Sequence, residues 1–166
     1  RYVGDLIPGT VSSQEWRVFR PGQAIDVTLE DVAGKAVALS SLRGRPAILV
    51  YAGRRGSDAA IVVGKALQSR FGSEAATPVA NVVPVACLAE VPRFLRGMAR
   101  TQVKQAAAGV PILIDFDSGL QRSLGMDEAA ANVAVIDATG HLVGITSGGG
   151  ETCVDCVAAL VHRLQA

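Results

Sequence analysis

The chain is a succession of short apolar runs ended by turn residues, and its most regular stretch is residues 45–60, RPAILVYAGRRGSDAA. Residues 47–52 are continuously apolar, which predicts a strand buried on both faces of a sheet. An elbow over residues 53–56, GRRG, follows at once, and a helical pattern begins with Ser57 as its expected N-cap. This order predicts the first half of a βα unit, in which ligands and chemistry sit beyond the carboxyl end of the strand.

The rest of the pattern alternates between strands and helices. Apolar residues at 25–29 and 36–39 predict a hairpin ahead of the central strand. Further strands are expected near 80–86, 111–116, 132–137 and 141–146, and helices near 57–71, 91–108, 119–125 and 153–164. Such alternation predicts an α/β domain with a mostly parallel sheet and helices on both faces, to which the closing hairpin adds an antiparallel edge.

Residues 1–24 show little periodicity, and we expect an irregular N-terminal arm with one short extended piece at residues 16–19. The domain itself then covers residues 25–166. In the helix near 91–108, four apolar residues are expected to face inward: Phe94, Leu95, Met98 and Val103. Four cations form the opposite stripe, read as a solvated face or, alternatively, a contact with an acidic partner: Arg93, Arg96, Arg100 and Lys104.

Composition narrows the function classes. With 166 residues, 49% of them hydrophobic and 19% charged, the chain can bury a large core and fits one domain. A net charge of +1 and seven aromatic residues argue against a general nucleic-acid binder or a base-stacking platform, which leaves a protein as the expected partner. The absence of a run of 18 apolar residues predicts that nothing here spans a membrane.

The sharpest chemical motif is the C-x-x-C formed by Cys153 and Cys156 at the start of the last helix. The pair has the local geometry of a redox motif, and the alternatives are a structural disulfide or two small core residues. No second ligand pair accompanies it, so neither a zinc site nor another metal site is expected. Cys87 follows a strand near the functional edge of the sheet, where a small buried hydrophobe is the favoured reading.

The elbow offers a second candidate site. Arg54, Arg55 and Ser57 stand between a strand end and a helix N-terminus, where they could hold an anion or a carboxylate. The alternative is a solvated turn that happens to be basic. His141 and His162 show no acid or base partner in the sequence, and we expect both to be structural or exposed.

Several motifs in fixed order resemble a known family: Leu42-x-Gly44, the strand and elbow, Ile114-Asp115, Leu124-Gly125 and Val135-Ile136-Asp137-x-x-Gly140. Over residues 22–166 the chain resembles the thioredoxin-like superfamily, in its redoxin branch with peroxiredoxin-like and TlpA-like members. The stretch from Ala52 to Arg54 is similar to the YtfJ-type bacterial proteins, which are exported. The resemblance implies a thioredoxin-like α/β fold with a central mixed sheet, a β-hairpin and an N-terminal extension.

The departures from that family decide the expected function. Active members place a reactive cysteine at the elbow, where this chain has residues 53–57, GRRGS, and Ser57 cannot replace a thiolate. Many members also carry a proline where this chain has Ala131-Asn132. We therefore expect a redox-inactive protein without a cofactor that binds or assembles protein partners in the periplasm or another extracytoplasmic compartment.

The rival hypothesis is a thiol–disulfide oxidoreductase that uses Cys153 and Cys156. Export, which the resemblance implies, would favour a disulfide between these two cysteines. Residues three apart at a helix start also lie close enough to bond. The sequence leaves the oligomeric state open, including a homo-oligomer.

Overall fold

The sheet at the centre of the protein has 8 strands in the order β1-β8-β7-β4-β5-β6-β2-β3. The computed structural model describes residues 16–17, 24–73, 75–107, 110–125, 130–147 and 151–165. The strands are β1 (Trp16–Arg17), β2 (Thr28–Glu30), β3 (Ala36–Ala38), β4 (Ala47–Ala52), β5 (Asn81–Cys87), β6 (Leu113–Asp115), β7 (Asn132–Ile136) and β8 (Leu142–Ser147). The helices are α1 (Ser57–Arg70), α2 (Arg96–Ala107), α3 (Gly119–Leu124) and α4 (Glu151–Gln165), with 3-10 turns η2 (Leu39–Leu42), η3 (Arg54–Gly56) and η4 (Arg93–Leu95).

Strand β4 lies in the middle of the sheet, and every one of its residues is buried. It pairs in parallel with β5 and antiparallel with β7. Because side chains alternate along a strand, Ile48 and Val50 pack with α1 and α4, whereas Leu49 and Tyr51 face the opposite core. The predicted strand buried on both faces is confirmed.

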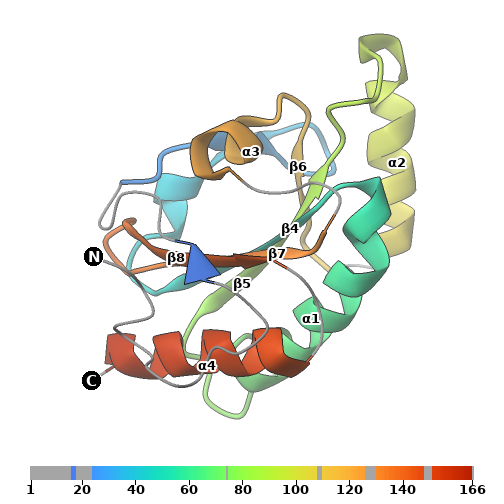
Figure 1. Ribbon diagram of the computed structural model, residues 1–166. Helices are drawn as coiled ribbons and strands as arrows, with labels where there is room; N and C mark the ends of the chain where they lie inside the picture. The colour runs from blue at the N-terminus through green and yellow to red at the C-terminus, as the bar shows by residue number, and fades with distance from the viewer. Residues whose placement is uncertain are drawn as a thin grey trace.

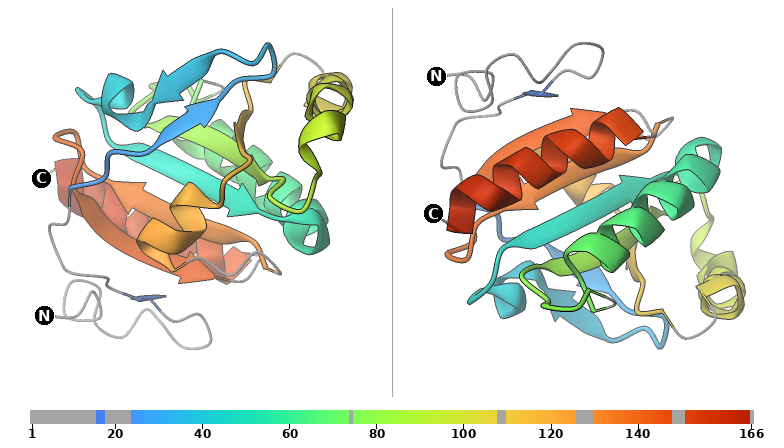
Figure 2. Two further views of the ribbon diagram at one scale, coloured as in Figure 1. Left: turned by 90° about the horizontal axis from the view of Figure 1, so that it is seen from above. Right: turned by 90° about the horizontal axis from the view of Figure 1, so that it is seen from below.

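Helices cover both faces of the sheet. Helices α1 and α4 run side by side across one face, and α3 and the β2–β3 hairpin lie over the other (Figures 1 and 2). Helix α2 stands beside the sheet, apart from both layers (Figure 1). Two large clusters of buried apolar side chains fill the space on the two faces, and a smaller one, around Ile114 and Phe116, lies under α2.

The strand directions correct one expectation. Among the described residues, parallel pairing is confined to β4–β5 and β5–β6. The central mixed sheet that the resemblance implies is therefore confirmed, whereas the mostly parallel sheet expected from the alternation of elements is not. The β2–β3 hairpin extends the sheet antiparallel beyond β6, and β7 and β8 extend it antiparallel beyond β4. Hairpins need only short connections, so antiparallel strands can be added at both edges without further crossover helices.

The N-terminal arm also takes part in the sheet. Trp16 and Arg17 pair antiparallel with Thr146 and Ile145 of β8, so β1 rather than the closing hairpin forms this edge among the described residues. This confirms the extended piece at Trp16–Arg17. Most of residues 1–24 lies outside the described ranges, so the division into an arm and a domain at 25–166 stays a prediction.

Several side chains of α2 and of the turn before it point in the direction opposite to the one that the sequence predicts. Arg96 and Arg100 point inward, with their guanidinium carbons 4.8 and 5.2 Å from the centre of the Phe116 ring. Phe94 and Met98 were expected to face inward, yet they are 84% and 61% exposed. The expected inward positions of Phe94 and Met98 and the expected solvated positions of Arg96 and Arg100 are therefore wrong. Val103 does pack against the cluster around Ile114 and Phe116, as expected. We call Arg96, Arg100 and Phe116 the arginine clamp.

Ionic contacts explain why the clamp forms. Arg96 reaches Asp117 at 3.4 Å, and Arg100 reaches Glu30 of β2 at 2.9 Å. A guanidinium group stacks well on an aromatic face, and its aliphatic stem packs against apolar surface. A hydrophobic pattern counts every arginine as polar, so it assigned these two to solvent. Arg93 and Lys104 are exposed, as expected.

We predict that Phe116→Ala lowers the free energy of unfolding by about 3 kcal/mol, because it removes a buried ring and the support of both guanidinium groups. Urea denaturation measures the change. Phe94→Ala is the matched control, since this ring is 84% exposed and its loss should change stability by less than about 0.5 kcal/mol. Equal decreases in the free energy of unfolding for the two variants would contradict the clamp, because Phe116 would then stabilise the protein no more than an exposed ring does.

Candidate functional site

The elbow leads from the carboxyl end of β4 through Gly53 and the 3-10 turn η3 into α1. Arg54, Arg55 and Ser57 are exposed, whereas Gly53 and Gly56 are buried. The Ser57 hydroxyl donates a hydrogen bond of 3.0 Å to the carbonyl oxygen of Arg54. Helix α1 begins at Ser57, and Gly56 is its N-cap. The expected N-cap role of Ser57 is therefore wrong.

The elbow packs directly on the segment that precedes β7. A Cβ atom added to Gly56 would lie 2.6 Å from the carbonyl carbon and oxygen of Ala130, which is closer than atoms can approach. Asn132 fixes this segment, because its side-chain amide donates to the backbone oxygens of Tyr51 at 3.2 Å and Ala130 at 3.0 Å. Its side-chain oxygen accepts a 2.7 Å hydrogen bond from the Ser147 hydroxyl. A buried amide therefore ties β7 and β8 to the strand that carries the elbow.

A groove of about 820 Å³ opens beside the elbow, at the carboxyl ends of β4 and β5. We call it the elbow groove. Its lining residues come from the elbow, the end of β5, the segment before α2, and α2: Ala52, Gly53, Arg54, Arg55, Ser57, Ala86, Cys87, Leu88, Glu90, Val91, Pro92, Leu95, Met98, Ala99, Gln102, Val103 and Ala106. The structure thus brings the predicted binding residues together with Cys87 and with the α2 face that the sequence placed in the core.

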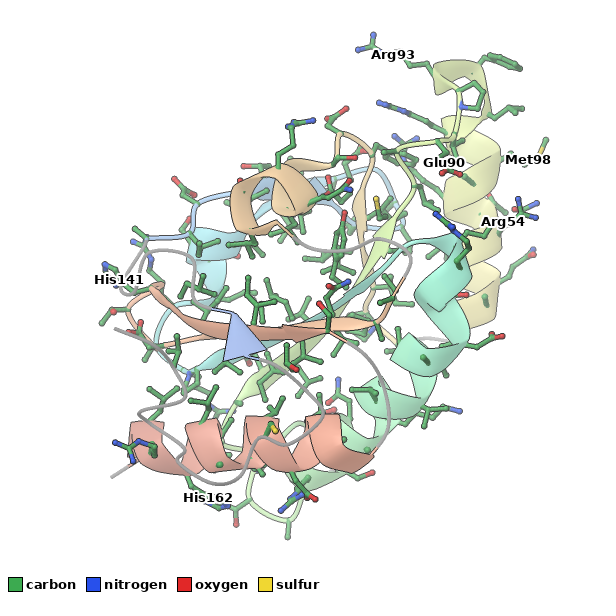
Figure 3. All side chains as sticks on the ribbon, viewed as in Figure 1. Arg54, Glu90, Arg93, Met98, His141 and His162 are labelled. Carbon is green, nitrogen blue, oxygen red and sulfur yellow. The ribbon has the colours of Figure 1, made fainter. Side chains whose placement is uncertain are left out.

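Charge in the elbow groove is concentrated at the elbow. Neither Arg54 nor Arg55 forms an ion pair with any residue in the described part of the chain. Glu90 is the only carboxylate among the lining residues, and Figure 3 shows Arg54 and Glu90 extending toward the space between the elbow and α2. The remaining lining is mostly apolar, which suits a ligand with apolar side chains and at least one negative group.

Polar groups buried beneath the groove form a second feature, which sequence reasoning missed. The Tyr51 hydroxyl, at the end of β4, lies 3.4 Å from a carboxylate oxygen of Asp115. Asp115 in turn accepts hydrogen bonds of 2.9 and 3.0 Å from the backbone N–H groups of Gly119 and Leu120 at the start of α3. The Ile114-Asp115 motif was a signal for this carboxylate, but nothing in the sequence connected it to Tyr51.

Burial raises the pKa of Tyr51 far above its usual value, and the adjacent side chains of Cys87 and Asp115 raise it further. Cys87 is 7% exposed, packs in the core and also lines the groove. It is therefore both a buried small side chain and a residue at the edge of the sheet, as the sequence predicted. The hydroxyl of Tyr51 is therefore a neutral hydrogen-bond donor that helps to hold the floor of the groove rigid.

The C-terminal cysteines lie elsewhere. Cys156, on α4, is 1% exposed and does not line the elbow groove. The side chain of Cys153 lies outside the described residues, so the predicted Cys153–Cys156 disulfide stays a prediction. The oxidoreductase hypothesis, which needs both thiols, likewise stays a prediction.

One histidine corrects the sequence reading. His141 does have an acidic neighbour, because its ring nitrogen lies 3.9 Å from Asp137 and 2.8 Å from the Thr139 hydroxyl. His162 is exposed, with its ring edge-on to Phe71 at 6.2 Å. Both residues are far in sequence from the elbow groove, and neither lines it.

Two searches over the described part of the chain complete the description of the site. No group of three or more His, Cys, Asp or Glu side chains gathers there as a metal ion would require. None of the helices in the same part has the length and apolar character needed to cross a membrane.

Several solved structures have a similar arrangement of strands and helices. An exposed lipoprotein thioredoxin from Streptococcus pneumoniae matches with a TM-score of 0.59 and 21% identity over 84% of this chain and 99% of that one. A secreted thiol-disulfide isomerase from Corynebacterium glutamicum matches with a TM-score of 0.61 and 17% identity over 96% and 95%. BsSco, of the Sco family of cytochrome c oxidase assembly proteins, matches with a TM-score of 0.60 and 13% identity over 90% and 98%.

The chain has the thioredoxin-like fold. No protein-family model and no curated protein sequence matches it. The resemblance implies that the elbow after β4, with the sequence GRRGS, occupies the place where active members carry their cysteines, and this correspondence stays a prediction. The nearer resemblance to YtfJ-type proteins stays a prediction.

We predict that Gly56→Ala destabilises the protein by about 1–3 kcal/mol, because the backbone of Ala130 cannot move aside as a flexible side chain would. The backbone angle φ of Gly56 is −96°, so its conformation suits alanine and the contact alone causes the loss. Gly97→Ala in α2 is the control. A Cβ there meets nothing within 4 Å, and it should stabilise the helix by about 0.5–1 kcal/mol. Thermal denaturation distinguishes the opposite signs, and a stabilised Gly56→Ala protein would rule the contact out.

We predict an alkaline loss of stability that depends on Tyr51. A tyrosine in the unfolded chain ionises near pH 10, whereas the raised pKa keeps Tyr51 neutral in the folded protein. Ionisation therefore favours the unfolded state, and stability that is complete below pH 10 falls by about 1.4 kcal/mol for each pH unit above it.

Urea denaturation at pH 8 and pH 11 should show this loss of stability for the native chain and a smaller loss for Tyr51→Phe. Other groups titrate alike in both proteins, so the comparison isolates Tyr51. The same decrease in both proteins would mean that Tyr51 already ionises in the folded state.

Proposed function

We propose that this protein is a redox-inactive thioredoxin-like binding or assembly protein that holds a segment of a partner protein in the elbow groove. The observation that carries the proposal is the composition of that groove. A superfamily position usually occupied by a reactive cysteine is filled by Arg54, Arg55 and Ser57, while the adjoining groove remains open and is lined with apolar side chains. Such a site retains what binding needs and has no thiol at the elbow, and Cys87, which lines the groove, is only 7% exposed.

The exposure of α2 supports binding over a purely structural role. Met98 lines the groove with 61% of its surface exposed, and Phe94 in the turn before α2 is 84% exposed. Methionine and aromatic side chains are enriched where proteins bind partners, because they supply large and adaptable contact area. Leaving them in water is unfavourable, and a partner that covers them would remove this cost.

An extracytoplasmic location, bacterial periplasm included, is part of the proposal. Two of the similar structures are described as an exposed lipoprotein and a secreted isomerase, and the third belongs to a family of assembly proteins. These descriptions concern those proteins, and they make both an external compartment and an assembly role reasonable for this chain. A disulfide between Cys153 and Cys156 would agree with that compartment.

The test separates binding from thiol chemistry. A photo-crosslinking phenylalanine derivative placed at Gln102, an exposed residue of the groove, should join the protein to one or a few discrete proteins from an extracytoplasmic extract. The same group at Arg122 on α3, which does not line the groove, is the control and should give none of these products.

Insulin reduction is measured in parallel on the native chain and on a variant with all three cysteines replaced by serine. We expect both to match the uncatalysed rate. Turnover by the native chain that is lost on Cys153→Ser would instead establish the oxidoreductase, and crosslinks of equal yield at both positions would exclude the groove as the binding site.

A further inference from the structure

We infer that the elbow groove is specific for an acidic, apolar peptide segment: a short stretch in which Asp or Glu stands next to aliphatic or aromatic residues. This inference rests on the proposed function and names the partner chemistry. Three features of the groove lead to it: its division into an apolar wall and a cationic end, the lack of anionic residues on α2, and the distance along which the apolar wall runs.

The wall and the end of the groove differ in kind. Val91, Leu95 and Met98 supply an apolar wall along the start of α2. Arg54 and Arg55 supply two guanidinium groups at the elbow, both exposed and neither ion-paired within the described residues. Guanidinium groups bind carboxylates through paired hydrogen bonds, so a ligand whose apolar side chains lie on the wall would place a carboxylate at this end.

The surroundings favour negative ligands as well. Residues 93–107, which form η4 and α2, contain four cationic side chains and no Asp or Glu. Arg96 and Arg100 are matched by Asp117 and Glu30, which leaves Arg93 and Lys104 exposed. The N-terminus of α1 points out of the elbow and adds partial positive charge. Two carboxylates reduce this positive charge: Glu90 lines the groove, and Asp58 lies in the first turn of α1.

The size of the wall sets the length of the segment. All the residues of η4 and α2 that line the groove lie between Leu95 and Ala106, over about 17 Å at 1.5 Å per residue, which matches about five residues of extended peptide. A second copy of this chain is a poor occupant. A symmetric dimer through the groove would bring like-charged elbows toward each other, which costs free energy.

The experiment selects peptides from a random decapeptide display library against the intact chain and measures each recovered peptide by fluorescence anisotropy. We expect recovered peptides to carry Asp or Glu within about two positions of Leu, Ile, Phe or Met, because the wall and the cationic end adjoin. Binding should weaken as salt rises. It should also weaken at least about tenfold in both Met98→Ser and the double variant R54Q/R55Q, the usual loss for an anchor residue.

Two control proteins match these variants. Val62→Ser removes an apolar side chain of α1 that is 63% exposed, close to the 61% of Met98, and that does not line the groove. The double variant K65Q/R122Q removes two exposed cations outside the groove, so it changes the net charge by the same amount as R54Q/R55Q. Each control should bind the selected peptides within about twofold of the native chain.

The outcomes separate the inference from the proposed function. Peptides that are lost on Met98→Ser but contain no acidic residues and ignore R54Q/R55Q would overturn the acidic specificity and leave groove binding intact. A selection in which no peptide depends on Met98 would overturn both. Sedimentation that shows a dimer of the native chain, dissociated by Met98→Ser, would make the groove a self-interface and also overturn the inference.

Discussion

Two arginine side chains fix the position of α2, and the character of the elbow groove depends on them. Arg96 and Arg100 lie on the Phe116 ring and meet Asp117 and Glu30, so the helix is held by its cationic face. The Nε atoms of both arginines are buried with no hydrogen-bond partner among the described residues, which shows how closely they are enclosed. Ala99 and Val103 pack inward beside these arginines, while Met98 stays 61% exposed and lines the groove.

The elbow is held in place by the segment that precedes β7. Gly56 lies against the backbone of Ala130, and Asn132 holds that segment to the end of β4. The buried Asn132 amide thus positions the segment by hydrogen bonds. The scaffold therefore preserves a groove at the carboxyl edge of the sheet, where α/β proteins usually bind ligands.

Polar side chains are also buried next to the groove, and the thiol among them, that of Cys87, is only 7% exposed. Tyr51, Cys87 and Asp115 come from the ends of three neighbouring strands, and Asp115 also caps the start of α3. A buried polar group is stable only if its hydrogen bonds are satisfied, so these residues constrain one another. The result is a firm floor under an adaptable wall, an arrangement suited to holding a partner segment.

The sequence by itself determined the order of elements, the buried central strand and the lack of a thiol at the elbow. These features are local, because a continuous apolar run, a Gly-rich turn and the identity of Ser57 can be read without knowing what lies nearby. Arg54, Arg55 and Ser57 could be named as binding residues for the same reason. The resemblance of ordered motifs such as Ile114-Asp115 then indicated the thioredoxin-like fold.

Only the tertiary structure decided which face of α2 is buried and which residues share the groove. Arg96 turns inward because Phe116, twenty positions along the chain, offers a ring and Asp117 a charge, and no periodicity of α2 itself contains that information. Met98 is exposed for the same reason. Contacts between residues distant in sequence depend on how strands are ordered and paired, and at Arg96 and Arg100 they override the local hydrophobic pattern.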